Sequence, residues 1–174
     1  MTEQEEQEEQ EEQTFQALLE SIYYRTMTVD VLRSATQYPA VAQRVDRNHE
    51  VPLHVACRYK ASVEMIQALI QAWPQSVEAR EDVFGWIPLD FACSDRALVE
   101  VIQALIQARP QSVEARDSKG RIPLHIACFH IASFEVISVL IQAWPESLRA
   151  RDKNSEIPLH SACTGKRSVE VIYV

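Results

Sequence analysis

The hexapeptide PLHVAC begins at Pro52 and returns as PLDFAC at Pro88, PLHIAC at Pro123 and PLHSAC at Pro158. The offsets between successive copies are 36, 35 and 35 residues. A constant period of this length is typical of repeat architectures, in which each unit buries its apolar face against its neighbours. The hexapeptide therefore predicts a stack of similar units rather than one irregular domain.

Two further strings recur at the same offsets between the hexapeptides. One reads SVEMIQALI from Ser62, LVEVIQALI from Leu98, SFEVISVLI from Ser133 and a last copy, SVEVI, from Ser168. The other reads WPQSVEARED from Trp73, RPQSVEARD from Arg109 and WPESLRARD from Trp144, with a diverged copy, YPAVAQRVD, from Tyr38. Three motifs in a fixed order define one repeating unit.

Each unit is predicted to form two helices. The first begins at Pro52, because proline is tolerated at the first helical position. The second begins near Ser62, a suitable N-cap, and carries apolar residues at helical spacing that face the first helix. Pro74 ends this helix, since the residue before a proline is disfavoured in the α region. The polar stretch that follows, through Asp82, is expected to form an extended return and a turn.

The repeats divide the chain into six segments. Residues 1–13 contain only Met, Thr, Glu and Gln, which cannot bury a core, so a solvated, disordered tail is expected there. The segments that follow are N-terminal capping helices with a half-repeat (14–45), three repeats (46–81, 82–116 and 117–151) and a truncated repeat (152–174). The truncation suggests a fragment of a longer array.

The pattern D-x-x-G-x-x-P-L-H-x-A, present at Asp117–Gly120 and Pro123–Ala127, resembles the ankyrin repeat. The resemblance covers residues 28 to 174 and implies an all-α solenoid of stacked helix–turn–helix units. It also implies a role in protein recognition rather than catalysis. The period here is longer than the family's usual one of about 33 residues.

Some family positions are not kept. The threonine that precedes Pro-Leu-His in the family is replaced by valine or isoleucine in all four units. The turn glycine is present as Gly85 and Gly120, but His49 and Ser155 stand at the equivalent positions. The turns at His49 and Ser155 are therefore expected to be looser or differently shaped.

Charge and hydropathy narrow the range of functions. The net charge is −8, and residues 3–12 hold seven glutamates, so the rest of the chain carries only −1. This near-neutral body lacks the clustered cations on which nucleic-acid binding rests, so a nucleic-acid partner is not expected. No stretch approaches 18 consecutive apolar residues and the N-terminus does not resemble a signal peptide, so no membrane partner and a cytoplasmic location are expected.

The residues that could carry chemistry are better explained as structural. His54, His125 and His160 occupy one position of successive repeats, about 8–10 Å apart, too far to share a metal ion. They are expected to bond to backbone, and Asp90 at the same position is expected to cap its helix. The cysteines of the hexapeptides are expected to be small core residues. We therefore expect no catalytic residue, metal, cofactor or small-molecule substrate, and no enzyme activity.

Positions that differ between repeats are the ones able to encode specificity. They lie in the turn before each Pro-Leu and at the end of the first helix of each unit. The predicted partner-binding residues are Arg47, Asn48, Glu50, Arg58, Tyr59, Phe84, Trp86, Asp95, Lys119, Arg121, Phe129 and His130.

Turn residues Phe84 and Trp86 are the most distinctive, because large aromatic side chains are enriched in binding hot spots. We expect them to form an apolar anchor with Tyr59 and Phe129. The surrounding rim is formed by Arg47, Arg58, Lys119 and Arg121. The alternative is that Trp86 folds back onto the neighbouring turn.

Taken together, these features predict a non-catalytic scaffold or adaptor that binds a protein partner of unknown identity through a concave groove and its turn tips. The alternatives are a regulatory ankyrin-repeat segment of a larger multidomain enzyme or channel, and a partial repeat gene with no specific partner.

Overall fold

The computed structural model describes residues 3–24, 39–46 and 48–164 of the 174-residue chain. All regular structure within these ranges is helical. The half-repeat predicted around Thr28–Leu32, the copy that begins at Ser168, and Tyr38 lie outside the described residues.

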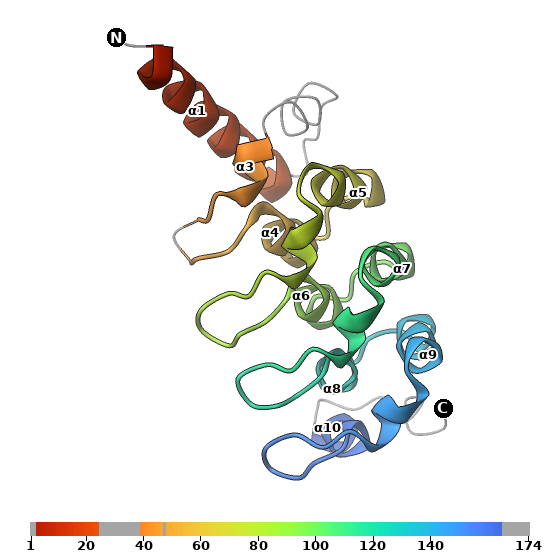
Figure 1. Cartoon of the computed structure of the whole chain (residues 1–174). Coiled ribbons are helices and arrows are strands. Elements are labelled where there is room, and N and C mark those ends of the chain that lie inside the picture. Colours follow the sequence, from red (N-terminus) through yellow and green to blue (C-terminus); the bar gives the residue numbers. More distant parts are fainter. Residues whose placement is uncertain (1–2, 25–38, 47, 165–174) are drawn as a thin grey trace.

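Three complete helix pairs and one further helix form two parallel rows (Figure 1). The inner row consists of α4 (Pro52–Arg58), α6 (Pro88–Ser94), α8 (Pro123–Phe129) and α10 (Pro158–Thr164). The outer row consists of α5 (Val63–Ala72), α7 (Val99–Ala108) and α9 (Phe134–Ala143). Each helix contacts the next helix of its own row and its partner in the other row. The turns project on the side opposite the outer row (Figure 1).

The inner helices are short because their ends are defined by local hydrogen bonds. Each begins with proline, and the side chain at the third position accepts the N–H of the residue before that proline, as His54 Nδ1 does from Val51 at 3.2 Å. Each described end has a residue in the left-handed region: Lys60 (φ 56), Arg96 (φ 56) and Ile131 (φ 57). The next N–H then bonds back to the helix, which completes a Schellman motif.

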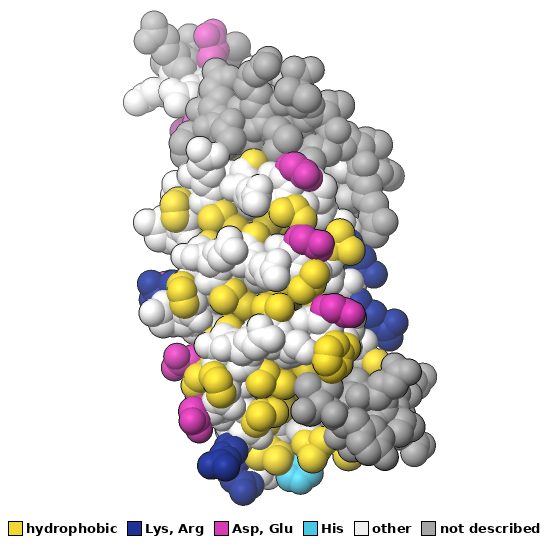
Figure 2. All heavy atoms as spheres, turned by 90° about the vertical axis from the view of Figure 1, so that its right-hand side faces the viewer, with side chains coloured by type: hydrophobic (Ala, Val, Ile, Leu, Met, Phe, Trp, Pro, Cys, Tyr) yellow, Lys and Arg dark blue, Asp and Glu magenta, His cyan; other side chains and the backbone are white. Residues whose placement is uncertain are grey.

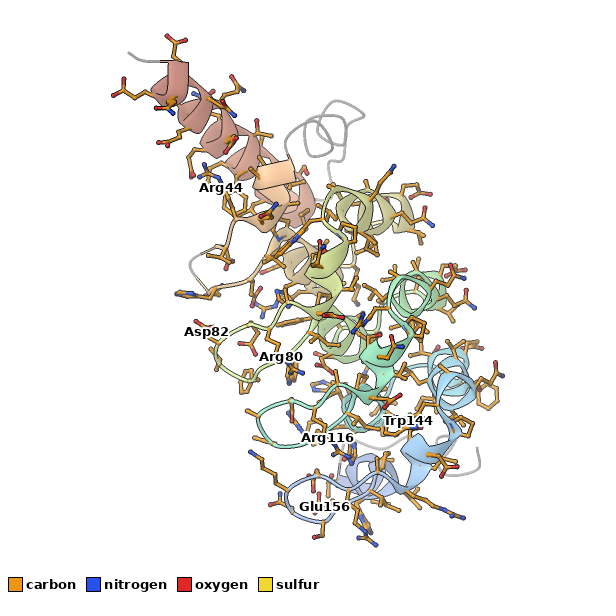
Figure 3. The ribbon with its side chains drawn as sticks, in the orientation of Figure 1. Arg44, Arg80, Asp82, Arg116, Trp144 and Glu156 are labelled. Atoms are coloured by element: carbon orange, nitrogen blue, oxygen red, sulfur yellow. The ribbon has the colours of Figure 1, made fainter. Side chains whose placement is uncertain are left out.

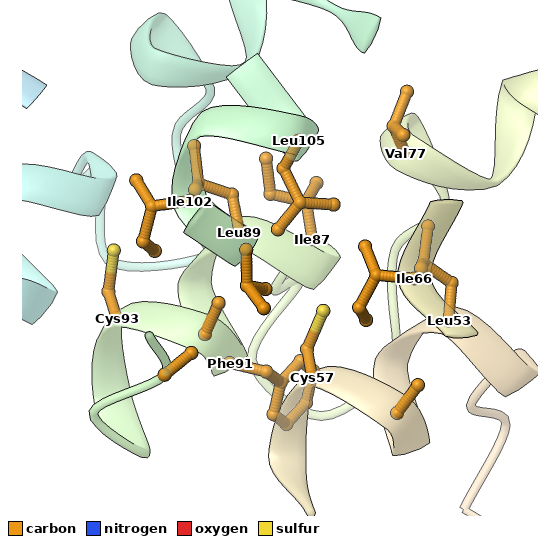
Figure 4. Packing of buried hydrophobic residues seen from close by; sticks show 14 of the residues in the cluster. Leu53, Cys57, Ile66, Val77, Ile87, Leu89, Phe91, Cys93, Ile102 and Leu105 are labelled. Atoms are coloured by element: carbon orange, nitrogen blue, oxygen red, sulfur yellow. The ribbon is translucent and has the colours of Figure 1, made fainter. Parts of the chain in front are cut away.

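The core runs continuously between the two rows and across the repeats. Leu53, Ile66, Leu89 and Ile102 are each at most 1% exposed and pack between the first two units (Figure 4). Small residues in the hexapeptides let the inner helices approach closely. Cys57, Cys93 and Cys128 are buried as expected, whereas Cys163 is exposed, contrary to the expectation. The repeated pattern therefore forms one shared core rather than separate units.

The outer helices follow the predicted boundaries. The Ser62 hydroxyl accepts the N–H of Met65, so the predicted N-cap is confirmed. The stretch after each outer helix differs from the expectation of an extended return. It forms a 3₁₀ helix in each unit: η1 (Pro74–Glu78), η2 (Pro110–Glu114) and η3 (Pro145–Arg149). Proline suits the first position of such a turn, and the buried side chains of Val77 and Val113 hold it against the core.

The turns at His49 and Ser155 have the same hydrogen-bond pattern as the turn at Gly120, so the expectation that they would be looser or differently shaped is wrong. His49 (φ 58) and Ser155 (φ 63) adopt the same left-handed backbone as Gly85 and Gly120. A carboxylate at the start of each turn accepts two or three backbone N–H groups, whether or not the turn contains glycine. These carboxylates belong to Asp46, Glu81, Asp117 and Asp152.

The N-terminal segment also differs from its prediction. Residues expected to form a disordered tail are helical from Glu3 and continue into the capping segment as α1 (Glu3–Tyr24). Glutamate and glutamine are good helix formers. Their side chains also pair four residues apart, and Arg44, which follows α3 (Pro39–Gln43), bonds to Glu12 at 2.6 Å. The side chains at residues 4–10 are exposed, as expected.

Candidate protein-interaction surface

The turn between the first two helix pairs reaches over to the third. The Trp86 ring lies 5.1 Å from the Phe91 ring and 6.4 Å from the His130 ring, in each case edge to face. It also lies 5.5 Å from the Phe84 ring. Trp86 is therefore half-buried against its neighbours, as the alternative prediction had it. Phe84 remains 44% exposed beside it, and Phe129, whose ring lies 5.1 Å from that of His130, is 42% exposed.

A shared carboxylate fixes the orientation of Trp86. The indole N–H donates to Asp117 Oδ2 at 3.3 Å. Arg121 donates to the same oxygen from Nε at 2.8 Å and lies 2.7 Å from it through its second nitrogen. The Asp117 side chain is fully buried. Arg121 is thus neutralised within the turn and does not act as a free cation on the rim.

Arg58 is likewise occupied, against the ring of Phe91. It forms an ion pair with the buried side chain of Glu50, and its guanidinium lies 4.6 Å from the centre of the Phe91 ring. Burial raises the pKa of Glu50 to about 7, although Arg58 acts in the opposite direction. Glu50 therefore holds Arg58 in place and is not itself a contact surface.

Asp95 and His130 complete the surface at the ends of the inner helices. Burial raises the pKa of Asp95, while a hydrogen bond from Ser94 and the nearby charges of Arg58 and His130 act against this shift. Burial also lowers the pKa of His130 below its ordinary value. His130 is therefore expected to be neutral at physiological pH and to offer a polar edge beside the aromatic rings.

The remaining predicted residues are more widely spread. Tyr59 is half-buried against the core of its own unit. Asn48 is exposed in the first turn, where its backbone N–H bonds to Asp46. Lys119 is exposed in the third turn. Arg47 lies outside the described residues. The surface is thus centred on the second and third units.

Two contributors were missed by the sequence reasoning. Phe91 is 2% exposed, yet its ring supports both Trp86 and Arg58. The sequence does distinguish Phe91, because the other hexapeptides have Val, Ile or Ser at this position. Arg96 donates to the His130 carbonyl at 3.2 Å and ties two inner helices together. Nothing in the residue pattern distinguishes Arg96 from an ordinary exposed arginine.

A ladder of arginines makes the turns rigid. Arg80 donates to the carbonyls of Gly85 and Arg116, at 2.7 and 2.8 Å. Arg116 repeats this arrangement with Gly120 and Arg151, at 2.6 and 2.7 Å. Figure 3 shows Arg80 and Arg116 at the bases of successive turns. The Phe84 carbonyl also accepts the N–H of Ser118 at 2.8 Å, so adjacent turns are joined directly.

The histidines and cysteines occupy structural positions. His54 Nε2 lies 2.9 Å from the Ala79 carbonyl, and burial lowers the pKa of His54 to about 4. Burial raises the pKa of Cys128 to about 12 and also raises that of Cys57, which favours the unreactive thiol. Asp90 accepts the Ile87 N–H at 3.0 Å, as the predicted cap. Among residues 3–24, 39–46 and 48–164, no three metal-ligating side chains gather together.

No protein-family model matches the sequence, and no curated protein is found to be similar to it. None of the helices in the described ranges has the length and apolar character needed to cross a membrane.

Proposed function

We propose that this chain is an ankyrin-like repeat module without chemistry of its own, which binds a partner protein through the surface around Trp86. The observation that carries the proposal is a row of ring contacts that runs from exposed Phe84 through the fixed Trp86 and His130 to exposed Phe129. Large aromatic side chains at the centre of a surface are characteristic of binding hot spots. Rigid turns also reduce the entropy that is lost on binding.

The arrangement of the repeats supports the ankyrin-like assignment. Each unit has a projecting turn, an inner helix that begins at Pro-Leu and an outer helix that ends before a proline. Backbone hydrogen bonds join Ser118 to Phe84 and Lys153 to Lys119, so the turns form a continuous edge beside the inner helices. A long edge and a row of helix ends together offer an extended surface to a partner.

A second apolar surface is the main competitor. The outer helices present rows of hydrophobic side chains with one glutamate in the first turn of each helix (Figure 2). Leu98 and Phe134 are 66% and 61% exposed there. Neither has an aromatic neighbour among the ring contacts of the described residues, whereas Phe84 and Phe129 each contact another ring. The surface around Trp86 is therefore the one in which aromatic rings contact one another.

The test is a pull-down from cell extract with the full chain, with proteins identified by mass spectrometry. The variant Phe84→Ser/Phe129→Ser removes the exposed rings and leaves Trp86 in place. The matched control is Leu98→Ser/Phe134→Ser on the outer helices. Circular dichroism establishes that each variant is folded.

We expect a partner that is retained by the wild type and by the outer-helix control but lost by Phe84→Ser/Phe129→Ser. Loss with the control alone would move the binding surface to the outer helices. Equal retention by all three proteins would contradict the proposed surface.

A further inference from the structure

The turns differ in charge, and the most basic turn lies directly beside the aromatic residues. With the arginine that precedes it, the third turn (residues 116–121) has Arg116, Lys119 and Arg121 against one carboxylate, a net charge of +2. On the same count the second turn (residues 80–86) carries −1 and the fourth (residues 151–156) carries 0. The net positive charge therefore lies on the side of Phe84 that faces the third turn.

Hydrogen bonds place the aromatic and basic residues in succession. The Ser118 N–H donates to the Phe84 carbonyl at 2.8 Å, and the Lys153 N–H donates to the Lys119 carbonyl at 3.0 Å. The Lys153 ammonium group donates to the Ser118 carbonyl at 2.7 Å. The turn tips therefore run from Phe84 to Lys119 and then to Lys153 along one edge.

The charge on this edge is not neutralised within the described part of the chain. Lys119, Lys153 and Arg116 form no ion pair there, and Arg116 bonds instead to two carbonyl oxygens. Asp117 is paired with Arg121, and Asp152 accepts N–H groups of its own turn. Lys119 and Lys153 are both exposed. An incoming carboxylate would find cations that do not first have to break an ion pair.

We infer that the partner segment is an acidic peptide with one large apolar side chain. The apolar side chain packs against Phe84, Trp86 and Phe129, and neighbouring carboxylates face Lys119 and Lys153. This inference rests on the proposed function and adds the chemistry of the partner to it. A nucleic acid suits the surface less well, because the exposed lysines Lys119 and Lys153 are fewer than the clustered cations on which phosphate binding rests.

The test uses a displayed library of random dodecapeptides selected against the full chain. Enriched sequences are synthesised with a fluorescein label, and their dissociation constants are measured by fluorescence anisotropy. We expect enriched peptides to combine a Trp, Phe or Leu with several Asp or Glu residues. Their binding weakens about tenfold in Lys119→Glu, since reversing the charge turns an attraction into a repulsion.

The matched control is Arg149→Glu, which makes the same charge change at an exposed position on η3. It leaves the dissociation constant of the peptides within about twofold, because an exposed charge more than about 10 Å away is screened by salt. Phe84→Ser/Phe129→Ser reports whether the peptides use the aromatic residues at all. A labelled oligo(dT) of about 20 nucleotides is the competitor that tests for nucleic acid binding.

Each result has one meaning. Enrichment of neutral or basic peptides that still depend on Phe84 and Phe129 overturns the acidic partner and leaves the proposed function standing. Peptides that bind equally to Phe84→Ser/Phe129→Ser, or no enrichment, contradict the proposed surface and the acidic partner together. If oligo(dT) displaces the peptides from the wild type but not from Lys119→Glu, the inference is overturned in favour of nucleic acid.

Discussion

The indole N–H of Trp86, in the second turn, donates to the buried carboxylate of Asp117, in the third turn, at 3.3 Å. Arg121 bonds to the same oxygen. This relationship joins two repeats by pairing Trp86, which differs from its counterparts in the other units, with a carboxylate that recurs at the start of each described turn. It also exposes Phe84 on one side of the tryptophan, so the contact that stabilises the turns shapes the proposed binding surface.

Trp86→Ala should destabilise the folded chain by about 2–4 kcal/mol, the usual cost of removing a large aromatic side chain from its packing. Trp86→Phe should cost about 1 kcal/mol, because it keeps part of the contact with Phe91 but loses one hydrogen bond. Urea unfolding followed by circular dichroism measures both values. Phe134→Ala, at a position 61% exposed, is the control and should cost less than Trp86→Ala. An unchanged midpoint in Trp86→Ala would mean that the tryptophan does not join the repeats.

Asp90→Asn should make the chain more stable at pH 8 than the wild type. Burial raises the pKa of Asp90 from 3.8 to about 7, and its Oδ1 has no partner among the described residues. A raised pKa in the folded state means that the stabilising contribution is present below pH 3.8 and is lost as the pH rises through 7. Asparagine keeps the acceptor for the Ile87 N–H and removes this dependence.

The measurement for Asp90 is the urea midpoint at several pH values between 4 and 8. The control is Glu114→Gln, an exposed position at the end of η2, which should leave the pH dependence as it is in the wild type. If the urea midpoints of the wild type and of Asp90→Asn change in parallel with pH, the raised pKa of Asp90 is contradicted.

The contribution of His54 to stability should depend on pH in the opposite direction to that of Asp90. Burial lowers its pKa from 6.5 to about 4, so its contribution to stability is present above pH 6.5 and is lost as the pH falls through 4. Nuclear magnetic resonance of the imidazole carbon-bound protons should therefore show a histidine that titrates near pH 4. If all imidazole signals titrate near pH 6.5, burial does not hold His54 neutral.

Lys60→Gly should stabilise the chain by about 1 kcal/mol, because lysine at φ 56 is held in a backbone region that glycine adopts without a steric cost. The side chain is exposed, so little packing is lost. Thermal unfolding checks the change. Lys119→Gly is the control, because the backbone of Lys119 is not left-handed. Glycine there should destabilise the variant by adding conformational entropy to the unfolded chain. A lower melting temperature in Lys60→Gly would show that the lysine makes a compensating contact.

Much of the helical pattern could be predicted from the period of the sequence. The helix starts at Pro52 and Ser62 follow local chemistry, namely the missing proline N–H and a hydroxyl cap. The helical state of residues 3–13 could not be predicted from their lack of apolar residues, because side-chain pairs and Arg44 stabilise it. The turn shape at His49 and Ser155 depends on a carboxylate three residues earlier, a signal present in the sequence but not used.

The candidate surface was only partly predictable. Comparison of the repeats distinguishes Phe84 and Trp86 from their counterparts, and ring contacts in the structure connect them with His130 and, through it, with Phe129. The pairing of Arg58 with Glu50 and of Arg121 with Asp117 depends on three-dimensional neighbours, so two residues expected on a charged rim are held within the fold. The recurrence of Arg80, Arg116 and Arg151 at the repeat period was a visible sign of the arginine ladder.

The most direct measurement of the central claim is site-specific crosslinking in cell extract. A photoreactive benzoylphenylalanine at position 84 replaces an exposed ring of the proposed surface, and the same residue at position 134 replaces an exposed ring of the outer helices. The account predicts that irradiation joins the chain to a discrete partner from position 84 and not from position 134. A partner captured only from position 134, or none captured from position 84 by a folded chain, would contradict it.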